Sequence, residues 1–201
     1  MKAMETEGGA VENWREARRS RILAAAVELF ASRGFVQVQM DDVARLAGMG
    51  KPTLYRYFPS KAELFLAAFD SLLDGLDTKL QDISTAPLPP RQQIAEMVHA
   101  LVMGLADQIA TLRYLEGESP ALAGRWRLAY RRRRETILSH LRKVVEAGIA
   151  ASDFEEVDLE VVPALIMGMV RGGLVGSTAS ALRTAAAAQE LVLGGLLKRP
   201  Q

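Results

Sequence analysis

Polar and aromatic side chains gather in residues 51–57, which read KPTLYRY. Leu54 and Phe58 recur four residues apart, so they predict the buried side of a short helix. The other side carries Lys51, Thr53, Tyr55, Arg56 and Tyr57. Long hydrogen-bond donors, a methyl group and planar rings can engage base edges and phosphates in a DNA major groove. The spacing therefore predicts a helix that reads DNA.

A second short helical pattern lies just upstream and ends at a glycine. Its apolar face comprises Val43, Ala44, Leu46 and Ala47, and Gly48 then interrupts it. Asp41 and Asp42 fall in its first turn, where carboxylates suit the helix dipole. Gly50 can cap the following helix, and Pro52 fits the first turn of that helix. Two short helices around a glycine-bearing turn predict a helix-turn-helix.

Longer helical patterns flank this motif. Asn13, followed by Glu16 three residues later, predicts the N-terminal cap of a first helix. Gly34 is predicted to end that helix. Ser60 and Glu63 predict a capping box for a helix that runs to about residue 81. That helix begins in the DNA-reading segment and continues beyond it.

The chain from about Arg18 to Phe69 resembles the TetR family of one-component transcriptional regulators. The resemblance rests on three segments in this order: RRSRILAAAVELFASRGF, DDVARLAG and GKPTLYRYFPSKAEL. It implies an N-terminal three-helix helix-turn-helix DNA-binding domain over residues 13–60. It also implies a C-terminal helical effector-binding and dimerisation domain over residues 61–201.

The family pattern, carried over position by position, predicts DNA contacts at ten residues. Lys51 and Arg56 are expected at or near bases, Thr53 and Tyr55 at bases or methyl groups, and Tyr57 and Lys61 at phosphates. The full predicted set is Gln39, Met40, Gly50, Lys51, Pro52, Thr53, Tyr55, Arg56, Tyr57 and Lys61. Gln39 and Gly50 stand where the family usually has hydroxyl caps, so slightly fewer phosphate contacts are expected.

Composition agrees with a regulator of this kind. The net charge of the 201 residues is +1, but residues 15–61 hold nine Lys or Arg against four Asp or Glu. Such a basic segment is the electrostatic footprint of a DNA-binding unit, although each arginine could also merely solvate a helix. The absence of cysteine excludes a disulfide framework and cysteine-based metal or redox chemistry.

Hydropathy argues against a membrane or secretory segment. The longest apolar stretch, residues 161–182, is interrupted by Pro163 and Arg171. An arginine near the middle of a membrane span costs at least about 2.5 kcal/mol. The N-terminus has no apolar secretory segment, so a cytoplasmic location is expected.

Only helical periods follow residue 91, so the fold is expected to be all-α. The predicted helices cover about 91–114, 119–124, 125–147, 159–180 and 183–198, with a turn-rich connection at 148–154. Gly168, Gly172 and Gly176 recur every four residues and predict a close approach of another helix. The 183–198 pattern has more apolar surface than one buried face needs.

In TetR-like proteins the last two long helices form the dimer interface. The predicted interface residues are Gly168, Gly172, Gly176, Leu191 and Leu193. The alternative is that both helices belong to the core of a monomer.

The resemblance also implies a small-molecule site in the second unit. Four consecutive arginines, residues 131–134, cannot share one solvated helix face. Arg133 and Arg134 fall nearest the apolar stripe of the same helix, which comprises Trp126, Tyr130, Ile137, Leu141 and Val144. One of them needs a carboxylate partner, for which Glu116 and Glu118 are candidates, or an acidic ligand. An internal salt bridge or a snorkelling arginine is the plainer interpretation.

The expected ligand lining is aromatic, methionine-rich and basic. It comprises Phe65, Phe69, Met97, Leu101, Met103, Tyr114, Trp126, Tyr130, Arg133 and Arg134, most of which could equally be core. His99 and His140 are isolated from any carboxylate motif, so no metal site and no cofactor are expected.

These features favour a ligand-responsive transcriptional regulator, a repressor that binds a palindromic operator as a homodimer and is released by a small molecule. The alternatives are a DNA-binding activator and an architectural DNA-binding protein without an effector. An enzyme is rejected because the sequence has no Gly-rich phosphate loop, zinc motif, cysteine nucleophile or serine-triad context.

Overall fold

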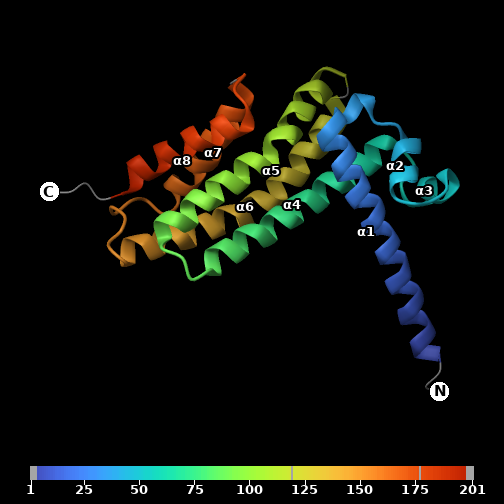
Figure 1. The fold of residues 1–201 in the computed structure, drawn as a ribbon, viewed down its shortest axis with the longest axis horizontal. Coiled ribbons are helices and arrows are strands. Elements are labelled where there is room, and N and C mark those ends of the chain that lie inside the picture. The colour runs from blue at the N-terminus through green and yellow to red at the C-terminus, as the bar shows by residue number, and fades with distance from the viewer. Residues whose placement is uncertain (1–3, 119, 177, 198–201) are drawn as a thin grey trace. The chain divides into compact units, whose positions relative to one another are not determined.

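The structure of the chain is a computed structural model that describes residues 4–118, 120–176 and 178–197. Side chains are described for these residues except 4–13, 107–118, 120 and 122. The described residues form helices α1 to α8 (Figure 1), and one isolated antiparallel bridge pairs Phe154 with Leu197. The expected all-α fold is confirmed. The chain divides into two compact units, Met1–Ser71 and Leu72–Gln201.

The first unit contains α1 (Met4–Gln37), α2 (Met40–Leu46), α3 (Lys51–Tyr57) and the start of α4 (Lys61–Thr85). Its core is built from one face of α1, the inner faces of α2 and α3, and the start of α4. Fully or almost fully buried members are Ile22, Ala26, Phe30, Val43, Ala44, Leu54 and Phe65. The Phe65 ring lies 5.2 Å from the rings of both Phe30 and Phe35, in edge-to-face geometry.

The first helix begins earlier than predicted. It starts at Met4 and not near Asn13, because the preceding segment contains no proline and its backbone stays helical. The expected break at Gly34 is confirmed: its φ of +72° is a left-handed conformation that favours glycine. Gly48, in the turn between α2 and α3, has a φ of +66° for the same reason.

The second unit contains the rest of α4, then α5 (Pro90–Glu118), α6 (Pro120–Ala150), α7 (Val161–Gly176) and α8 (Ala181–Leu196). Helix α5 packs against α6, α7 and α8, and these helices run beside it in Figure 1. Ile94, Met97 and Leu101 of α5 are fully buried in this core. The buried Gln93 amide donates to the carbonyls of Ile83 and Ala86, at 3.0 and 2.9 Å, and so fixes the connection between α4 and α5.

The predicted boundaries of α6 are corrected. The patterns at 119–124 and 125–147 form the single helix α6, which continues to Ala150. This helix includes Gly148, where the Phe154 ring packs so closely that a β-carbon would lie 2.1 Å from it. Asp158 caps the start of α7, since its carboxylate accepts from the backbone N–H groups of Glu160 and Val161 at 2.8 and 3.0 Å.

Across the described part of the chain, none of the helices is both long enough and apolar enough to span a bilayer.

Candidate functional site

Helix α3 is anchored by two apolar side chains and presents polar ones outward. Leu54 is completely buried and Phe58 is 5% exposed, as the sequence predicts. Lys51, Tyr55 and Arg56 are exposed, whereas Thr53 and Tyr57 are half-buried. The outward face of α3 therefore carries two cations and a phenol on a helix whose orientation is fixed by its buried side.

The short helix α2 is held against α1 and the turn by hydrogen bonds. Arg21 of α1 donates from Nη2 to the Ala47 carbonyl at the end of α2, at 2.8 Å. At the other end of α2, the Asp42 carboxylate accepts from the backbone N–H of Gln39 at 3.4 Å and from Arg45 at 2.8 Å. Gly50 begins α3 without a side-chain cap, as the sequence indicates.

Lys51, predicted to contact bases, is already engaged by a carboxylate. Its Nζ lies 2.8 Å from Asp41 Oδ1 and 3.1 Å from Asp41 Oδ2. The hydrogen bond to Asp41, together with its charge, raises the pKa of Lys51 above its ordinary value, so the ammonium is charged at neutral pH. Asp41 therefore competes with DNA groups for Lys51, a competition that the sequence interpretation missed because Asp41 was interpreted only through the helix dipole.

Lys61, predicted to contact phosphate, has a structural role in the first unit. Its Nζ donates to the carbonyls of Val36 and Val38, at 3.0 and 2.9 Å, and lies 4.6 Å from the centre of the Phe35 ring. Partial burial lowers the pKa of this ammonium. An ammonium has three donors, so one N–H remains for a phosphate.

The predicted DNA contacts gather around two surface hollows of the first unit. Gln39, Met40, Lys51, Tyr55 and Lys61 line one of about 710 Å³. Arg56 and Tyr57 line the other, of about 370 Å³, together with Trp14 and Arg15 of α1. Gly50 directly precedes α3, and Pro52 and Thr53 fall in the first turn of this helix.

Met40 departs from the expectation of a side-chain contact. It is 7% exposed, so its side chain belongs to the core and only its backbone amide could reach a phosphate.

Trp14 and Arg15 were not among the predicted contacts. The Arg18 guanidinium lies 3.8 Å from the centre of the Trp14 ring, and Trp14 is 47% exposed. An exposed tryptophan among arginines at residues 14–19 is the sequence signal that could have placed this part of α1 beside α3.

The predicted dimer residues lie on α7 and α8, and Gly168 among them also lines a cavity described below. Among the described residues, no heavy atom outside the helix's own backbone comes within 4 Å of a β-carbon built on Gly168, Gly172 or Gly176. No helix among the described residues therefore approaches this glycine stripe. Leu191 is 65% exposed, while Leu193 is half-buried. The apolar surface that the sequence indicated is thus left uncovered in the single chain.

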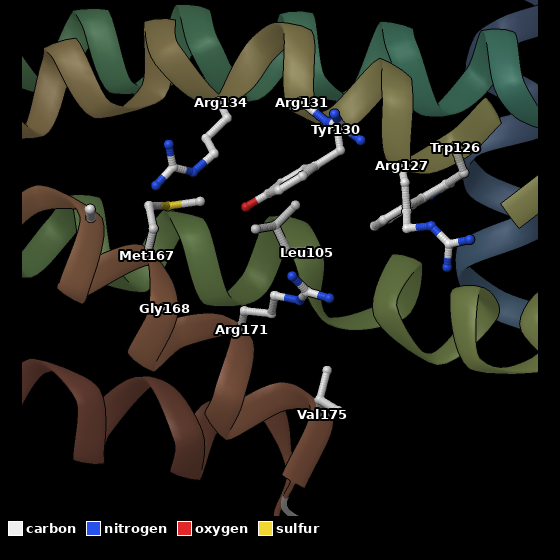
Figure 2. Close-up of a pocket in the computed structure, with 11 residues that line it drawn as sticks. Leu105, Trp126, Arg127, Tyr130, Arg131, Arg134, Met167, Gly168, Arg171 and Val175 are labelled. Atoms are coloured by element: carbon white, nitrogen blue, oxygen red, sulfur yellow. The ribbon is translucent and has the colours of Figure 1, made fainter. Parts of the chain in front are cut away.

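A cavity of about 360 Å³ lies between α5, α6 and α7 (Figure 2). Its described lining is both basic and apolar: Leu105, Trp126, Arg127, Tyr130, Arg131, Arg134, Ala164, Met167, Gly168, Arg171 and Val175. The Trp126 and Tyr130 rings stack with their centres 5.8 Å apart. Burial raises the pKa of the Tyr130 phenol, and the nearby Arg171 and Arg134 act in the opposite direction.

Three of the predicted ligand residues line this cavity: Trp126, Tyr130 and Arg134. Phe65, Phe69, Met97 and Leu101 are at most 1% exposed and are not in the described lining of this cavity. Met103, 40% exposed, is also absent from the lining. The side chains of Tyr114, Glu116 and Glu118 lie outside the described residues.

Arg133 also lies outside the cavity lining. Its Nη2 is 2.6 Å from Asp74 Oδ1 of α4. Sequence reasoning missed the contribution of α7 to the lining, because the 159–180 pattern was assigned wholly to the dimer interface.

No group of three or more metal-ligating side chains occurs in the portion of the chain that the structure describes. His140, considered and rejected as a metal ligand, lies 2.9 Å from Asp77 Oδ1, which links α6 to α4.

Comparison with known proteins matches both units. Residues 22–68 match the model described as bacterial regulatory proteins, tetR family, and residues 87–173 match a tetracyclin repressor-like C-terminal domain. The transcriptional activator FasR of Mycolicibacterium smegmatis is 37% identical over 86 residues, which are 43% of this chain and 39% of FasR. The regulator YhgD of Bacillus subtilis is 27% identical over 143 residues, covering 71% of this chain and 75% of YhgD.

The fold has known counterparts. FadR from Bacillus subtilis, solved in complex with stearoyl-CoA, superposes with a TM-score of 0.62 and 19% identity over 88% of this chain and 98% of FadR. This likeness concerns the fold alone. The match to FasR spans less than half of that protein.

Proposed function

This chain belongs to the TetR family of bacterial regulatory proteins, and on that premise we propose that it is a transcriptional repressor that binds a palindromic operator as a homodimer. Family members are regulators and not enzymes. The observation that carries the proposal is the outward face of α3, where Lys51, Tyr55 and Arg56 are exposed while Leu54 and Phe58 hold the helix in place. The protein would act in the cytoplasm, where it meets DNA.

Ten residues are proposed to contact DNA, and they would divide by role. Arg56 and Lys51 would reach bases, because long side chains with hydrogen-bond donors can read base edges. Thr53 and Tyr55 would contact bases or thymine methyl groups beside them. Phosphate contacts would position the unit on DNA, and they would come from Tyr57, Lys61, Gln39 and the backbone amides near Gly50. Pro52 and Met40 would lie beside these contacts. Arg15 and Trp14 would extend this surface along α1.

The dimer would form through α7 and α8. Gly168, Gly172 and Gly176 allow a second backbone to approach closely, and Leu191 and Leu193 supply apolar area. A two-fold dimer would present two copies of α3 to half-sites about one DNA turn apart, which is why the operator should be an inverted repeat.

The cavity of the second unit would hold the small molecule that releases the operator. Its volume of about 360 Å³ and its mixed apolar and polar lining suit a small ligand. Stearoyl-CoA in the FadR complex supports the idea that this fold accommodates a small molecule. The ligand can weaken DNA binding only by the ratio of its affinities for the two conformations.

Selection of bound fragments from a random DNA pool tests the DNA-binding part of the proposal. The expected result is enrichment of one inverted repeat, bound with one dimer per site. Recovery of unrelated sequences with equal affinity would overturn sequence-specific regulation and favour an architectural role.

An activator is the second candidate, because FasR, 37% identical over 86 residues, carries that name. The two candidates differ in where the operator lies relative to a promoter. In vitro transcription from a template carrying the selected site separates them: a repressor lowers transcript yield and an activator raises it.

A further inference from the structure

The cavity between α5, α6 and α7 is strongly basic. Arg127, Arg131 and Arg134 of α6 and Arg171 of α7 line it, and its described lining includes no Asp or Glu. Arg127, Arg131 and Arg134 share one face of α6, since residues three and four apart on a helix are neighbours. Among the described lining residues, the guanidinium groups of Arg131, Arg134 and Arg171 favour an anion.

Two of these arginines lie on opposite walls around one phenol. In Figure 2 Arg134 reaches from α6 toward α7, Arg171 projects from α7, and the Tyr130 hydroxyl points into the space between these helices. Burial raises the pKa of that phenol, and the charges of Arg171 and Arg134 act in the opposite direction. Because burial raises the pKa of Tyr130, its hydroxyl stays protonated and can donate a hydrogen bond.

The neighbouring Arg133 shows what an internally neutralised arginine looks like in this protein. Its guanidinium lies 2.6 Å from the Asp74 carboxylate on the other side of α6. No described carboxylate lies within ion-pair distance of Arg134 or Arg171. An internal salt bridge therefore explains Arg133 and leaves the charges of the other two directed at the cavity.

The remaining walls of the cavity are apolar. Leu105 of α5, Met167 and Val175 of α7, and the stacked rings of Trp126 and Tyr130 contribute this surface. Methionine and aromatic walls accept an aliphatic chain of variable shape. A purely ionic ligand would leave this surface uncovered, so the lining favours a molecule with both an apolar part and a charged head.

We propose that the effector is an amphiphilic anion whose carboxylate or phosphate binds between Arg134 and Arg171, with the Tyr130 hydroxyl as a third donor. Guanidinium groups bind both kinds of head in bidentate geometry. The apolar part of the effector packs against Leu105, Trp126 and Met167. This inference rests on the proposed effector role of the cavity and adds the chemical class of the ligand.

Three probes with the same eight-carbon chain test the proposal: octanoate, octyl phosphate and octanol, each titrated calorimetrically into the DNA-free protein below its micellar concentration. Both anions are expected to bind at least about tenfold more tightly than octanol, the equivalent of one charge-assisted hydrogen bond. If octyl phosphate binds more tightly, the effector has a phosphate head group. If octanoate binds more tightly, the effector has a carboxylate head group. Either result supports an anion site.

Matched variants locate the site. Arg134→Gln and Arg171→Gln should each weaken anion binding about tenfold and leave octanol binding unchanged. Arg132→Gln is the control, because Arg132 is exposed on the same helix and lies outside the lining. Circular dichroism checks that each variant is folded.

Equal binding of octanol and the anions, equal losses in Arg132→Gln, or no binding of any probe would overturn the proposal. Because the titration contains no DNA, such a failure leaves operator recognition intact. Failure of the DNA selection would instead contradict the regulator itself, whatever the titration shows.

Discussion

The Lys51 ammonium of α3 lies 2.8 Å from the Asp41 carboxylate of α2, so the two helices of the DNA-reading motif are joined by an exposed ion pair. A carboxylate at this position is repelled by DNA phosphates while it holds a cation that DNA would attract. We therefore expect the pair to oppose unspecific association, because Asp41 partly neutralises the charge of Lys51.

Asp41→Asn should raise the affinity for unrelated DNA several-fold and make that binding more sensitive to salt. The substitution removes a negative charge from the DNA-facing surface and frees Lys51 to release counterions from phosphates. Fluorescence anisotropy at several salt concentrations measures both effects. Glu160→Gln, an exposed charge change in the second unit, is the control and should have no effect. A loss of affinity in Asp41→Asn would instead mean that the carboxylate positions Lys51 for binding.

Gly148→Ala should destabilise the protein by about 1–3 kcal/mol, the usual cost of overpacking a filled site. A β-carbon there would lie 2.1 Å from the buried Phe154 ring. Urea unfolding provides the measurement. Gly124→Ala in the same helix is the matched control, because its added β-carbon meets nothing within 4 Å. That control should be neutral or stabilising by up to about 1 kcal/mol, and equal effects of the two changes would refute the packing argument.

Leu191→Glu should convert the dimer to a monomer, since it places a charge in the apolar face proposed to meet a second copy. Leu191 is 65% exposed in the single chain, so the monomer itself should remain folded. Sedimentation analysis gives the mass of each species. Leu128→Glu, at a 46% exposed leucine of α6, should leave the dimer intact. A wild-type monomer, or a dimer that persists in Leu191→Glu, would place the interface elsewhere.

Tyr130 should give the stability of the protein a component that is lost at alkaline pH. Burial raises its pKa above the ordinary value of 10.0 in the folded state. The unfolded chain therefore releases this proton first as pH rises, which favours unfolding. The contribution is complete below about pH 10 and is lost as pH rises toward the folded pKa. Urea unfolding of wild type and Tyr130→Phe should diverge only above that pH; a divergence that sets in near neutrality would contradict the assignment.

The sequence predicted the DNA-reading motif well because its signals are local. The four-residue spacing of Leu54 and Phe58, the glycine at 48 and the cap at Ser60 each act within one or two helical turns. The structure confirms the buried pair, the positive φ and the hydrogen bond from the backbone N–H of Glu63 to Ser60 Oγ at 3.2 Å.

The cavity was predicted less completely because its walls come from helices distant in sequence. A helical stripe identified Trp126 and Tyr130, but nothing local indicates that Arg171 of α7 faces them. Arg133 and Arg134 show the limit clearly. Their sequence position demanded either a carboxylate or an acidic ligand, and only the packing of α6 shows that Arg133 meets Asp74 while Arg134 faces the cavity.

The most direct test of the central claim, that α3 reads operator sequence, compares Arg56→Ala with Tyr57→Phe on the selected operator and on its single-base variants. Arg56→Ala should relax the preference at one base pair of each half-site, a loss of about 1–3 kcal/mol in discrimination. Tyr57→Phe should weaken binding to all the variants alike, because it removes a phosphate contact. Identical effects of the two changes across the whole set of sequences would contradict the claim.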